Sequence, residues 1–238
     1  MISDKNVIAI VPARGGSKGL PGKNTKLLCG KPLIVWTIDV ALKSKLVDEL
    51  VVSTDSREIA AIAREAGAPV PFLRPAQLAT DTVPTIDVVE HALGFFSVNK
   101  GVPFDYVVLL EPTSPLREDD DIDNMLRKLH ASAESFDSII SVGQVSEHPS
   151  IMKKLLGEKI EPFCPGLQMT ARRQDNQPAF FPYGVAYIAK TKSLMAERTF
   201  YTKRCTHYRI KRYQNYEIDD IYDFLAVENI MRHEWDLA

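Results

Sequence analysis

Apolar runs and helical patterns alternate along the first 145 residues. Val7–Val11 is a continuous β-branched run, typical of a strand covered on both faces, and Pro32–Leu42 has apolar residues at helical spacing behind a proline suited to a helix start. Further strands are predicted at Glu49–Thr54, Tyr106–Leu110 and Ser138–Val142, with helices over 57–66, from a capping Thr85 to about Phe96, and over Asp120–His130. Strands separated by such helices form βαβ units, so we expect an α/β domain with a mostly parallel sheet.

The pattern changes after residue 142. Residues 143–182 contain five prolines and only short strand-like pieces, and we interpret them as an excursion of short strands and loops that packs on a second subunit. Regular patterns return as a strand at Gly184–Ala189, a helix near 191–198, a strand at His207–Lys211 and a closing helix at Asp220–Arg232. A chain of 238 residues fits one domain of this kind, and we expect 1–238 to be a single unit.

Composition narrows the class of partner. The formal net charge of −2 argues against a general nucleic-acid binder, whereas the clustering of Arg14, Lys18, Lys23, Lys26 and Lys31 near the N-terminus suits a small anionic ligand. The three cysteines form no CxxC pair and indicate neither a disulfide framework nor a zinc site. No apolar run approaches the roughly 20 residues of a membrane span, and no signal peptide opens the chain. We therefore expect a cytoplasmic protein without nucleic-acid or membrane partners.

The segment Pro12–Asn24 (PARGGSKGLPGKN) carries the strongest chemical signal. It follows the first predicted strand, and ligands of parallel sheets bind beyond the carboxyl ends of strands. Four glycines within eight positions let the backbone approach a ligand, while Arg14, Lys18 and Lys23 match the charge of a nucleoside triphosphate. The segment is neither a P-loop nor a dinucleotide fingerprint, because GxxxxGK[ST] and GxGxxG are both absent. A flexible surface turn is the alternative.

Three further motifs follow this loop in order. They are Leu73–Ala76 (LRPA) with Ala79–Thr82 (ATDT), Pro112–Arg117 (PTSPLR) and Arg173–Asp175 (RQD). Together with the loop, they make the chain resemble the acylneuraminate cytidylyltransferases, which are the CMP-sialic acid synthetases and their legionaminic and pseudaminic acid relatives. The resemblance implies a Rossmann-like nucleotide-diphospho-sugar transferase fold, a homodimer and dependence on Mg²⁺. It also implies a reaction in which the anomeric hydroxyl of a nonulosonic acid attacks the α-phosphorus of CTP and pyrophosphate leaves.

The same resemblance assigns nucleotide-binding residues. Arg14 and Lys23 are the expected catalytic residues that hold the triphosphate. Their neighbours in the loop are Ala13, Gly15, Ser17 and Asn24. Arg74 is expected beside the cytosine, with Asp81 and Thr85 nearby, although a solvated loop arginine is the plain alternative for Arg74.

The sugar side departs from the family in two places. Glu111 stands where many relatives have Gln, and an ionised carboxylate accepts hydrogen bonds but cannot donate one. Tyr183 stands where relatives have Asn within Pro-Asn-Gly-Ala. Either change can mark a different sugar, and Glu111 can also be a structural carboxylate at a strand end.

Other residues on the sugar side match the family. Arg173 resembles the contact to the sugar carboxylate, a task that suits a planar guanidinium, while a dimer salt bridge or a role for Arg172 remains open. Lys153, or Lys154 beside it, corresponds to a lysine that reaches into the partner's site. Aromatic residues expected to wall the sugar pocket, or to belong to the core, are Tyr187, Phe200 and Tyr201.

Two carboxylates before the last helix complete the predicted site. Alternation along a strand would put Glu217 and Asp219 on one face, where they can hold a hard cation, and the resemblance makes this cation Mg²⁺. Two other functions remain as alternatives: a cytidylyltransferase for the eight-carbon sugar Kdo, whose loop typically lacks the Gly-Gly-Ser-Lys found here, and a non-catalytic nucleotide-binding scaffold. The choice among sialic, legionaminic and similar acids stays open.

Overall fold

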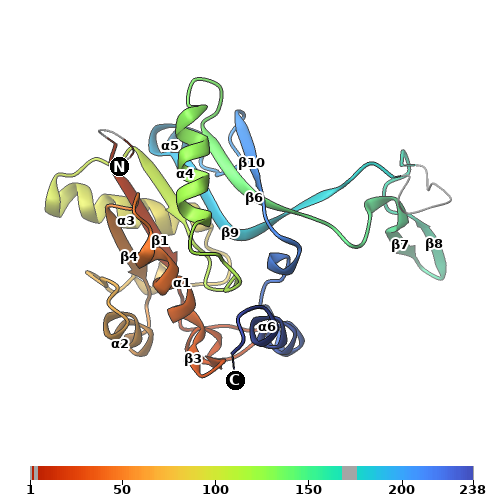
Figure 1. Cartoon of the computed structure of the whole chain (residues 1–238), viewed down its shortest axis with the longest axis horizontal. Helices are drawn as coiled ribbons and strands as arrows, with labels where there is room; N and C mark the ends of the chain where they lie inside the picture. Colours follow the sequence, from red (N-terminus) through yellow and green to blue (C-terminus); the bar gives the residue numbers. More distant parts are fainter. Residues whose placement is uncertain (1, 3–4, 168–175, 238) are drawn as a thin grey trace.

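A computed structural model describes residues 2, 5–167 and 176–237 of the chain (Figure 1). Its main sheet has the strand order β10-β6-β9-β5-β1-β4. The strands are β1 (Val7–Pro12), β4 (Glu49–Ser53), β5 (Tyr106–Leu109), β6 (Ser138–Gln144), β9 (Phe180–Lys190) and β10 (Cys205–Arg209). β1 pairs in parallel with β4 and β5, and β10 pairs in parallel with β6. The predicted α/β class and mostly parallel sheet are confirmed.

The exception is β9, which runs antiparallel to both β5 and β6. The described residues between β6 and β9, 145–167 and 176–179, form no α-helix, whereas a parallel neighbour would need a long crossover that is usually helical. The alternation of helix and strand therefore could not reveal this strand's direction.

Helices cover both faces of the sheet. One face packs against α1 (Leu33–Lys43), α2 (Arg57–Glu65) and α4 (Asp121–Ala131), and the other against α3 (Thr85–Lys100) and α5 (Thr191–Glu197). Alternate residues of β1 serve the two faces: Ala9 and Val11 belong to the first core, and Ile8 and Ile10 to the second. All four are fully buried, as the uninterrupted apolar run predicted.

Several predicted boundaries differ from the structure, and β9 begins at Phe180, four residues before the predicted start at Gly184. α3 begins after Pro84, with Thr85 as its first residue and no side-chain cap, and it continues to Lys100 because Gly94 does not break it. β10 occupies Cys205–Arg209, two residues earlier than predicted. The closing helix α6 (Ile221–Glu234) has Asp220 as a true cap, since its side chain accepts hydrogen bonds from the N–H groups of Tyr222 and Asp223.

Residues 143–182, predicted as an excursion, contain a hairpin that stands apart from the main sheet (Figure 1). β7 (Lys153–Leu156) pairs with β8 (Lys159–Pro162), and the short helix η3 (Pro149–Ile151) precedes them. Its apolar side chains face solvent: Leu155 is 73% exposed and Ile160 67%. No helix among the described residues is long and apolar enough to cross a membrane.

Candidate active site

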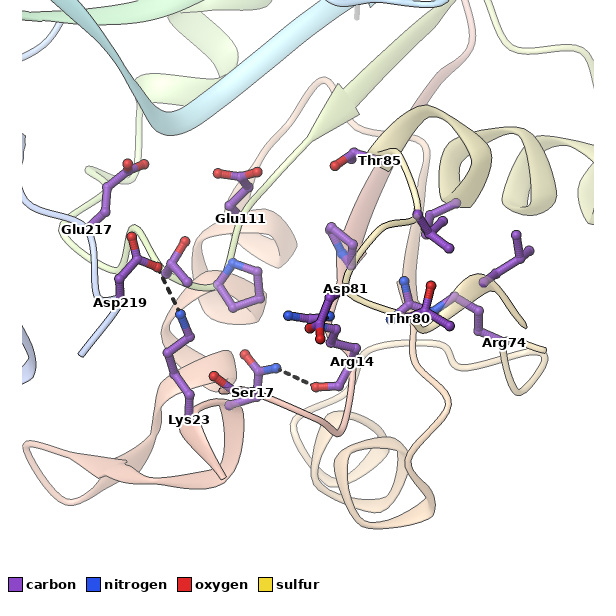
Figure 2. A pocket seen from close by; sticks show the side chains of 17 residues that line it. Arg14, Ser17, Lys23, Arg74, Thr80, Asp81, Thr85, Glu111, Glu217 and Asp219 are labelled. Atoms are coloured by element: carbon purple, nitrogen blue, oxygen red, sulfur yellow. Dashed lines mark hydrogen bonds and ion pairs between the residues drawn. The ribbon is translucent and has the colours of Figure 1, made fainter. Parts of the chain in front are cut away.

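A cavity of about 370 Å³ lies beyond the carboxyl ends of β1 and β5 (Figure 2). Its walls come from the glycine-rich loop, the segment before α3, the end of β5 and the segment before α6. The lining side chains with hydrogen-bonding or charged groups are Arg14, Ser17, Lys23, Asn24, Arg74, Thr80, Asp81, Thr85, Glu111, Thr113, Glu217 and Asp219. Sequence segments more than 200 residues apart thus meet in one site.

The glycine-rich loop is fixed by its own hydrogen bonds and by the segment before α6. Gly22 adopts φ +67° before the short helix η1 (Lys23–Thr25), and the buried Asn24 donates from Nδ2 to the carbonyl of Arg14 at 3.0 Å. A Cβ on Gly19 would collide with the carbonyl oxygen of Asp219, so this glycine permits close approach to the chain itself. The loop is therefore a docked structure, and the interpretation as a flexible surface turn is wrong.

Lys23 joins the loop to the acidic segment. Its Nζ donates to the carbonyl of Ile218 at 2.6 Å and lies 3.2 Å from Oδ1 of Asp219 (Figure 2). The side chain is 12% exposed, so its charge sits inside the cavity wall. A phosphate entering between the loop and Asp219 would meet this ammonium group directly.

Asp81 lies on the opposite side, where it bridges two loop cations. One carboxylate oxygen pairs with Arg14 and the other with Lys18. Hydrogen bonds from Lys18 and Arg14 hold the pKa of Asp81 below its usual range. The carboxylate thus occupies the guanidinium of Arg14, which the resemblance assigns to the triphosphate, and the ammonium of Lys18, whose charge suits a triphosphate, whereas the resemblance placed Asp81 itself near the base.

Arg74 is buried, with a 4% exposed side chain, and lies 4.0 Å from Asp55. Burial lowers its pKa, although Asp55 opposes this effect. Its Nε and Nη2 atoms have no hydrogen-bond partner among the described residues. A buried donor without an acceptor costs about 1–3 kcal/mol, so these N–H groups are poised for an acceptor on a ligand. The alternative of a solvated loop arginine is wrong.

Glu111 and Glu217 converge on Gly184. A Cβ at Gly184 would lie 2.5 Å from Oε2 of Glu111 and 2.7 Å from Oε1 of Glu217, so any other residue would force the two carboxylates apart. Glu217 accepts hydrogen bonds from the Gly184 N–H at 2.5 Å and from the hydroxyl of Ser114 at 2.9 Å. Burial raises the pKa of Glu111 to about 7, and the charge of Glu217 adds to this effect.

Arg117, the last residue of PTSPLR, lies behind this pair and is 2% exposed. Its guanidinium donates to the carbonyls of Val185, of Gly184 at 3.0 Å and of Glu111 at 3.2 Å, and to the hydroxyl of Thr37 at 3.0 Å. Burial lowers its pKa to about 10, while Asp121 and Glu111 oppose this effect, so the group stays charged at neutral pH. Arg117 thereby ties the end of β5 to β9.

The acidic segment differs from its prediction. Residues 215–218 form no strand, and Glu217 and Asp219 are placed by the contacts to Gly184 and Lys23 instead of by strand alternation. Asp219 is 83% exposed. The part of the chain that the structure describes holds no group of three or more His, Cys, Asp or Glu side chains arranged around a metal position.

A second cavity of about 280 Å³ adjoins the first and shares Thr85 and Glu111 with it. The ring of Tyr187 contacts those of Phe200 and Tyr201, whose centroids lie 6.2 and 6.1 Å away. Phe200 belongs to the core, but all three aromatic side chains line the cavity. For Phe200, the two alternatives therefore hold together, because it packs in the core and also lines the cavity.

Not every predicted residue reaches these cavities. Ala13 and Gly15 face β4 and its loop, because their N–H groups donate to the Ser53 carbonyl and to Asp55 at 2.9 Å each. Lys153 lies on the hairpin, and Arg173 falls outside the described residues.

Sequence reasoning missed Gly184, Ser114, Arg117 and Arg198. The motif PTSPLR was a signal for two of them, since it carries Ser114 and Arg117. Arg198 lines the second cavity, in ion pairs with Asp87 and Glu90, and no pattern in the sequence marked it.

Comparisons with known proteins agree with the geometry. The family model described as Cytidylyltransferase matches residues 8–232. The chain is 36% identical over 236 residues to the CMP-N,N'-diacetyllegionaminic acid synthase of Legionella pneumophila, covering 94% of this chain and 96% of that protein. It is 35% identical to an N-acylneuraminate cytidylyltransferase of Streptococcus agalactiae, but spans only 52% of that protein's length. A CMP:2-keto-3-deoxy-manno-octonic acid synthetase complexed with CTP has a TM-score of 0.68 at 17% identity, covering 96% of this chain and 99% of that one, and it supports the fold.

Proposed function

The chain belongs to the cytidylyltransferase family, and we propose that it joins CTP to a nonulosonic acid to give the CMP-sugar and pyrophosphate. The observation that carries this proposal is the pair of adjoining cavities: one where the loop cations Arg14 and Lys23 suit a triphosphate and an aromatic one suited to a sugar, with Glu111 shared between them. The relatives named above favour a nine-carbon sugar acid over Kdo, because the Kdo enzyme resembles this chain in fold at 17% identity.

We propose that Arg14, Ser17, Lys23 and Asn24 receive the triphosphate and that Arg74 receives the base. The two unpartnered donors of Arg74 suit the carbonyl oxygen and ring nitrogen of cytosine, which are both acceptors. Uracil would present an N–H at the ring position, so Arg74 would leave one donor unsatisfied. This difference is a physical basis for preferring CTP.

The reaction needs an oxygen–phosphorus bond to form as another breaks. The anomeric oxygen bonds to the α-phosphorus, and the bridging oxygen leaves with the pyrophosphate. Such transfers depend on positioning and charge compensation, which Lys23 and Arg14 supply on the leaving side. Glu111, at the junction of the cavities, is placed to accept the proton that the attacking hydroxyl loses as the new bond forms.

We also propose that Glu217 and Asp219 hold Mg²⁺. The fit rests on the donor set: Glu217 and Asp219 offer hard carboxylate oxygens, and their charges contribute to the raised pKa of Glu111, so a divalent cation bound there would offset this repulsion. Bound Mg²⁺ would compensate the charge of the phosphate oxygens. Lys23 supplies a single positive charge and therefore neutralises only one of the negative charges gathered here.

The hairpin is proposed to dock on a second copy of the chain. Apolar side chains on it, including Leu155, Ile160 and Phe163, are more than half exposed, which is unusual for a surface that stays in water. Lys153 would then lie near the partner's sugar pocket. Sedimentation measures the oligomeric state and a turnover assay measures the activity. A monomer that retains full activity would contradict this arrangement. We further propose that the reaction takes place in the cytoplasm, where CTP is made.

A direct assay tests the main proposal. Pyrophosphate release is measured with CTP, Mg²⁺ and, in turn, legionaminic, sialic and pseudaminic acids and Kdo, with UTP as the nucleotide control. The proposal predicts release with CTP and at least one nine-carbon acid. Release with Kdo alone, or with none of the acids, would overturn it.

A further inference from the structure

A separate crevice, away from the two cavities of the active site, lies at the parallel pair β6 and β10. It has a volume of about 310 Å³ and follows the carboxyl ends of β6 and β10. Its lining residues are Gln144, Val145, Ser146, Arg209, Ile210, Arg212 and Asn215. The antiparallel β9 separates it from the active site, which lies at β1 and β5. The sheet therefore offers two places where ligands of parallel strands ordinarily bind.

Two arginines at this crevice are held in place by aromatic rings. The guanidinium carbon of Arg209 lies 5.0 Å from the ring centre of Phe180, and that of Arg212 lies 5.2 Å from the ring centre of Tyr216. Arg212 also donates from Nη2 to the hydroxyl of Ser146 at 2.8 Å. Both arginines are exposed, and each ring contact restricts its guanidinium while leaving other N–H groups for a ligand.

Among the described residues, no carboxylate lies within 4.0 Å of the guanidinium group of Arg209 or of Arg212. Two basic residues close to them in the sequence do have carboxylate partners: Arg204 pairs with Asp137 at 2.7 Å, and Lys211 pairs with Glu118 at 2.5 Å. The positive charge left in this part of the surface is thus concentrated on the two stacked guanidiniums.

Asn215 adds a polar wall to the crevice. It is 8% exposed and donates from Nδ2 to the Gln144 carbonyl at 2.8 Å. Its Oδ1 is buried and has no hydrogen-bond partner among the described residues. Gly143 makes room for this amide, because a Cβ there would overlap it. The buried Oδ1 of Asn215 faces Gly143 and makes the amide a fixed part of the crevice wall, while the two arginines that line the crevice supply the donors that an anionic ligand needs.

We propose that the crevice at β6 and β10 binds a phosphate dianion through Arg209 and Arg212. Two guanidiniums match two negative charges, and the planar donor edges suit phosphate oxygens. A phosphate monoester of a sugar and free inorganic phosphate share this chemistry. Only the monoester brings further hydroxyl groups to the wall at Asn215. This site is separate from the proposed triphosphate site, and nothing in it depends on the sugar that the enzyme activates.

Calorimetric titration of the full chain tests the proposal. CDP is kept at saturation, so that the cations of the active site are occupied, and the probes are glucose 6-phosphate, inorganic phosphate and glucuronate. The wild-type chain should bind at least one of the two phosphates at one per chain and bind glucuronate at least ten-fold more weakly. The double variant Arg209→Gln with Arg212→Gln should lose at least ten-fold in phosphate affinity while binding CDP as the wild type does.

A matched double variant, Lys192→Gln with Lys203→Gln, removes two exposed charges elsewhere and should leave phosphate binding unchanged. Tighter binding of glucose 6-phosphate would identify the monoester as the ligand, and equal binding would identify the phosphate group alone. The proposal fails if the wild-type chain binds neither phosphate at 20 mM. It also fails if both double variants weaken binding equally, or if removing the arginines only dissociates an oligomer in sedimentation.

Discussion

The two sides of the active site are built in different ways. On the nucleotide side, the glycine-rich loop follows one strand and contributes Arg14, Ser17, Lys23 and Asn24 within eleven residues of one another. On the sugar side, Glu111, Gly184, Glu217 and the aromatic residues come from four separate stretches, held together by buried contacts such as those of Arg117. The nucleotide side is a local motif, and the sugar side is a product of the tertiary fold.

The charge of the two sides also differs. The loop brings cations, whereas Glu111, Glu217 and Asp219 gather negative charge around β9. Lys23 stands where the two meet, since its Nζ contacts the acidic segment from the basic loop. Chemistry at this junction therefore depends on both sides of the site. Substitutions on the two sides should affect different properties, namely turnover, stability of the fold or affinity for the nucleotide.

Lys23→Ala should have the largest effect on turnover. The change removes the ammonium group at the junction, and loss of one such charge typically costs about 10²–10³-fold in rate. kcat/KM with CTP is the measurement, and circular dichroism should show an intact fold. Lys26→Ala, three residues later on the exposed side of the loop, is the control and should retain activity. Near-normal turnover of the Lys23 variant would remove Lys23 from the mechanism.

Arg117→Met should mainly affect folding. Methionine has a similar length but leaves three buried carbonyls and the Thr37 hydroxyl without their donor, and breaking such a buried network typically costs about 3–5 kcal/mol. Urea unfolding measures the difference. Arg127→Met, on an exposed stretch of α4, is the matched control and should cost under about 1 kcal/mol. Equal unfolding free energies for the two variants would show that the sugar side does not depend on Arg117.

The same contrast explains what the sequence could predict. The loop, the βαβ order and the presence of Lys23 in the cavity follow from local patterns, because a short stretch contains both the glycines and the cations. The direction of β9 and the convergence of Glu111 and Glu217 on Gly184 do not, since they depend on which strands become neighbours. Arg117 was visible as part of a motif, yet its burial among carbonyls is a tertiary property.

Glu111→Gln should change how stability depends on pH. The pKa of Glu111 is about 7 in the folded chain against a usual 4.5, so the folded state binds more protons between these values and stability falls as pH rises through them. Glutamine cannot ionise, and the variant should be more stable than the wild type above pH 7, by up to about 3 kcal/mol, but not below pH 4.5. Urea unfolding in EDTA across this range is the measurement.

Glu118→Gln provides a control of opposite sign for this pH series. Despite partial burial, hydrogen bonds from Lys211 and Tyr213 hold the pKa of Glu118 below its usual range. Its ionised form therefore stabilises the fold above the usual pKa, and removing it should lower stability near neutral pH. Parallel pH profiles for the wild type and the Glu111 variant would mean that Glu111 is not strained by burial or by Glu217.

Asp81→Asn should have the smallest effect, on nucleotide affinity. Asp81 pairs with Arg14 and Lys18, so an entering triphosphate must displace its carboxylate before it can use those cations. Because the pairs are partly exposed, the gain on removing them is modest, and KM for CTP should fall about two- to five-fold at low salt and less at high salt. Asp119→Asn, which removes a more exposed carboxylate from its pair with Lys43 away from the cavity, should leave KM unchanged. A rise in KM for the Asp81 variant would instead make Asp81 a ligand of the nucleotide, as the family resemblance implies. The direction of the change in KM therefore decides between two roles for Asp81. A fall means that its carboxylate pairs with the loop cations only until the triphosphate displaces it, and a rise means that it binds the nucleotide.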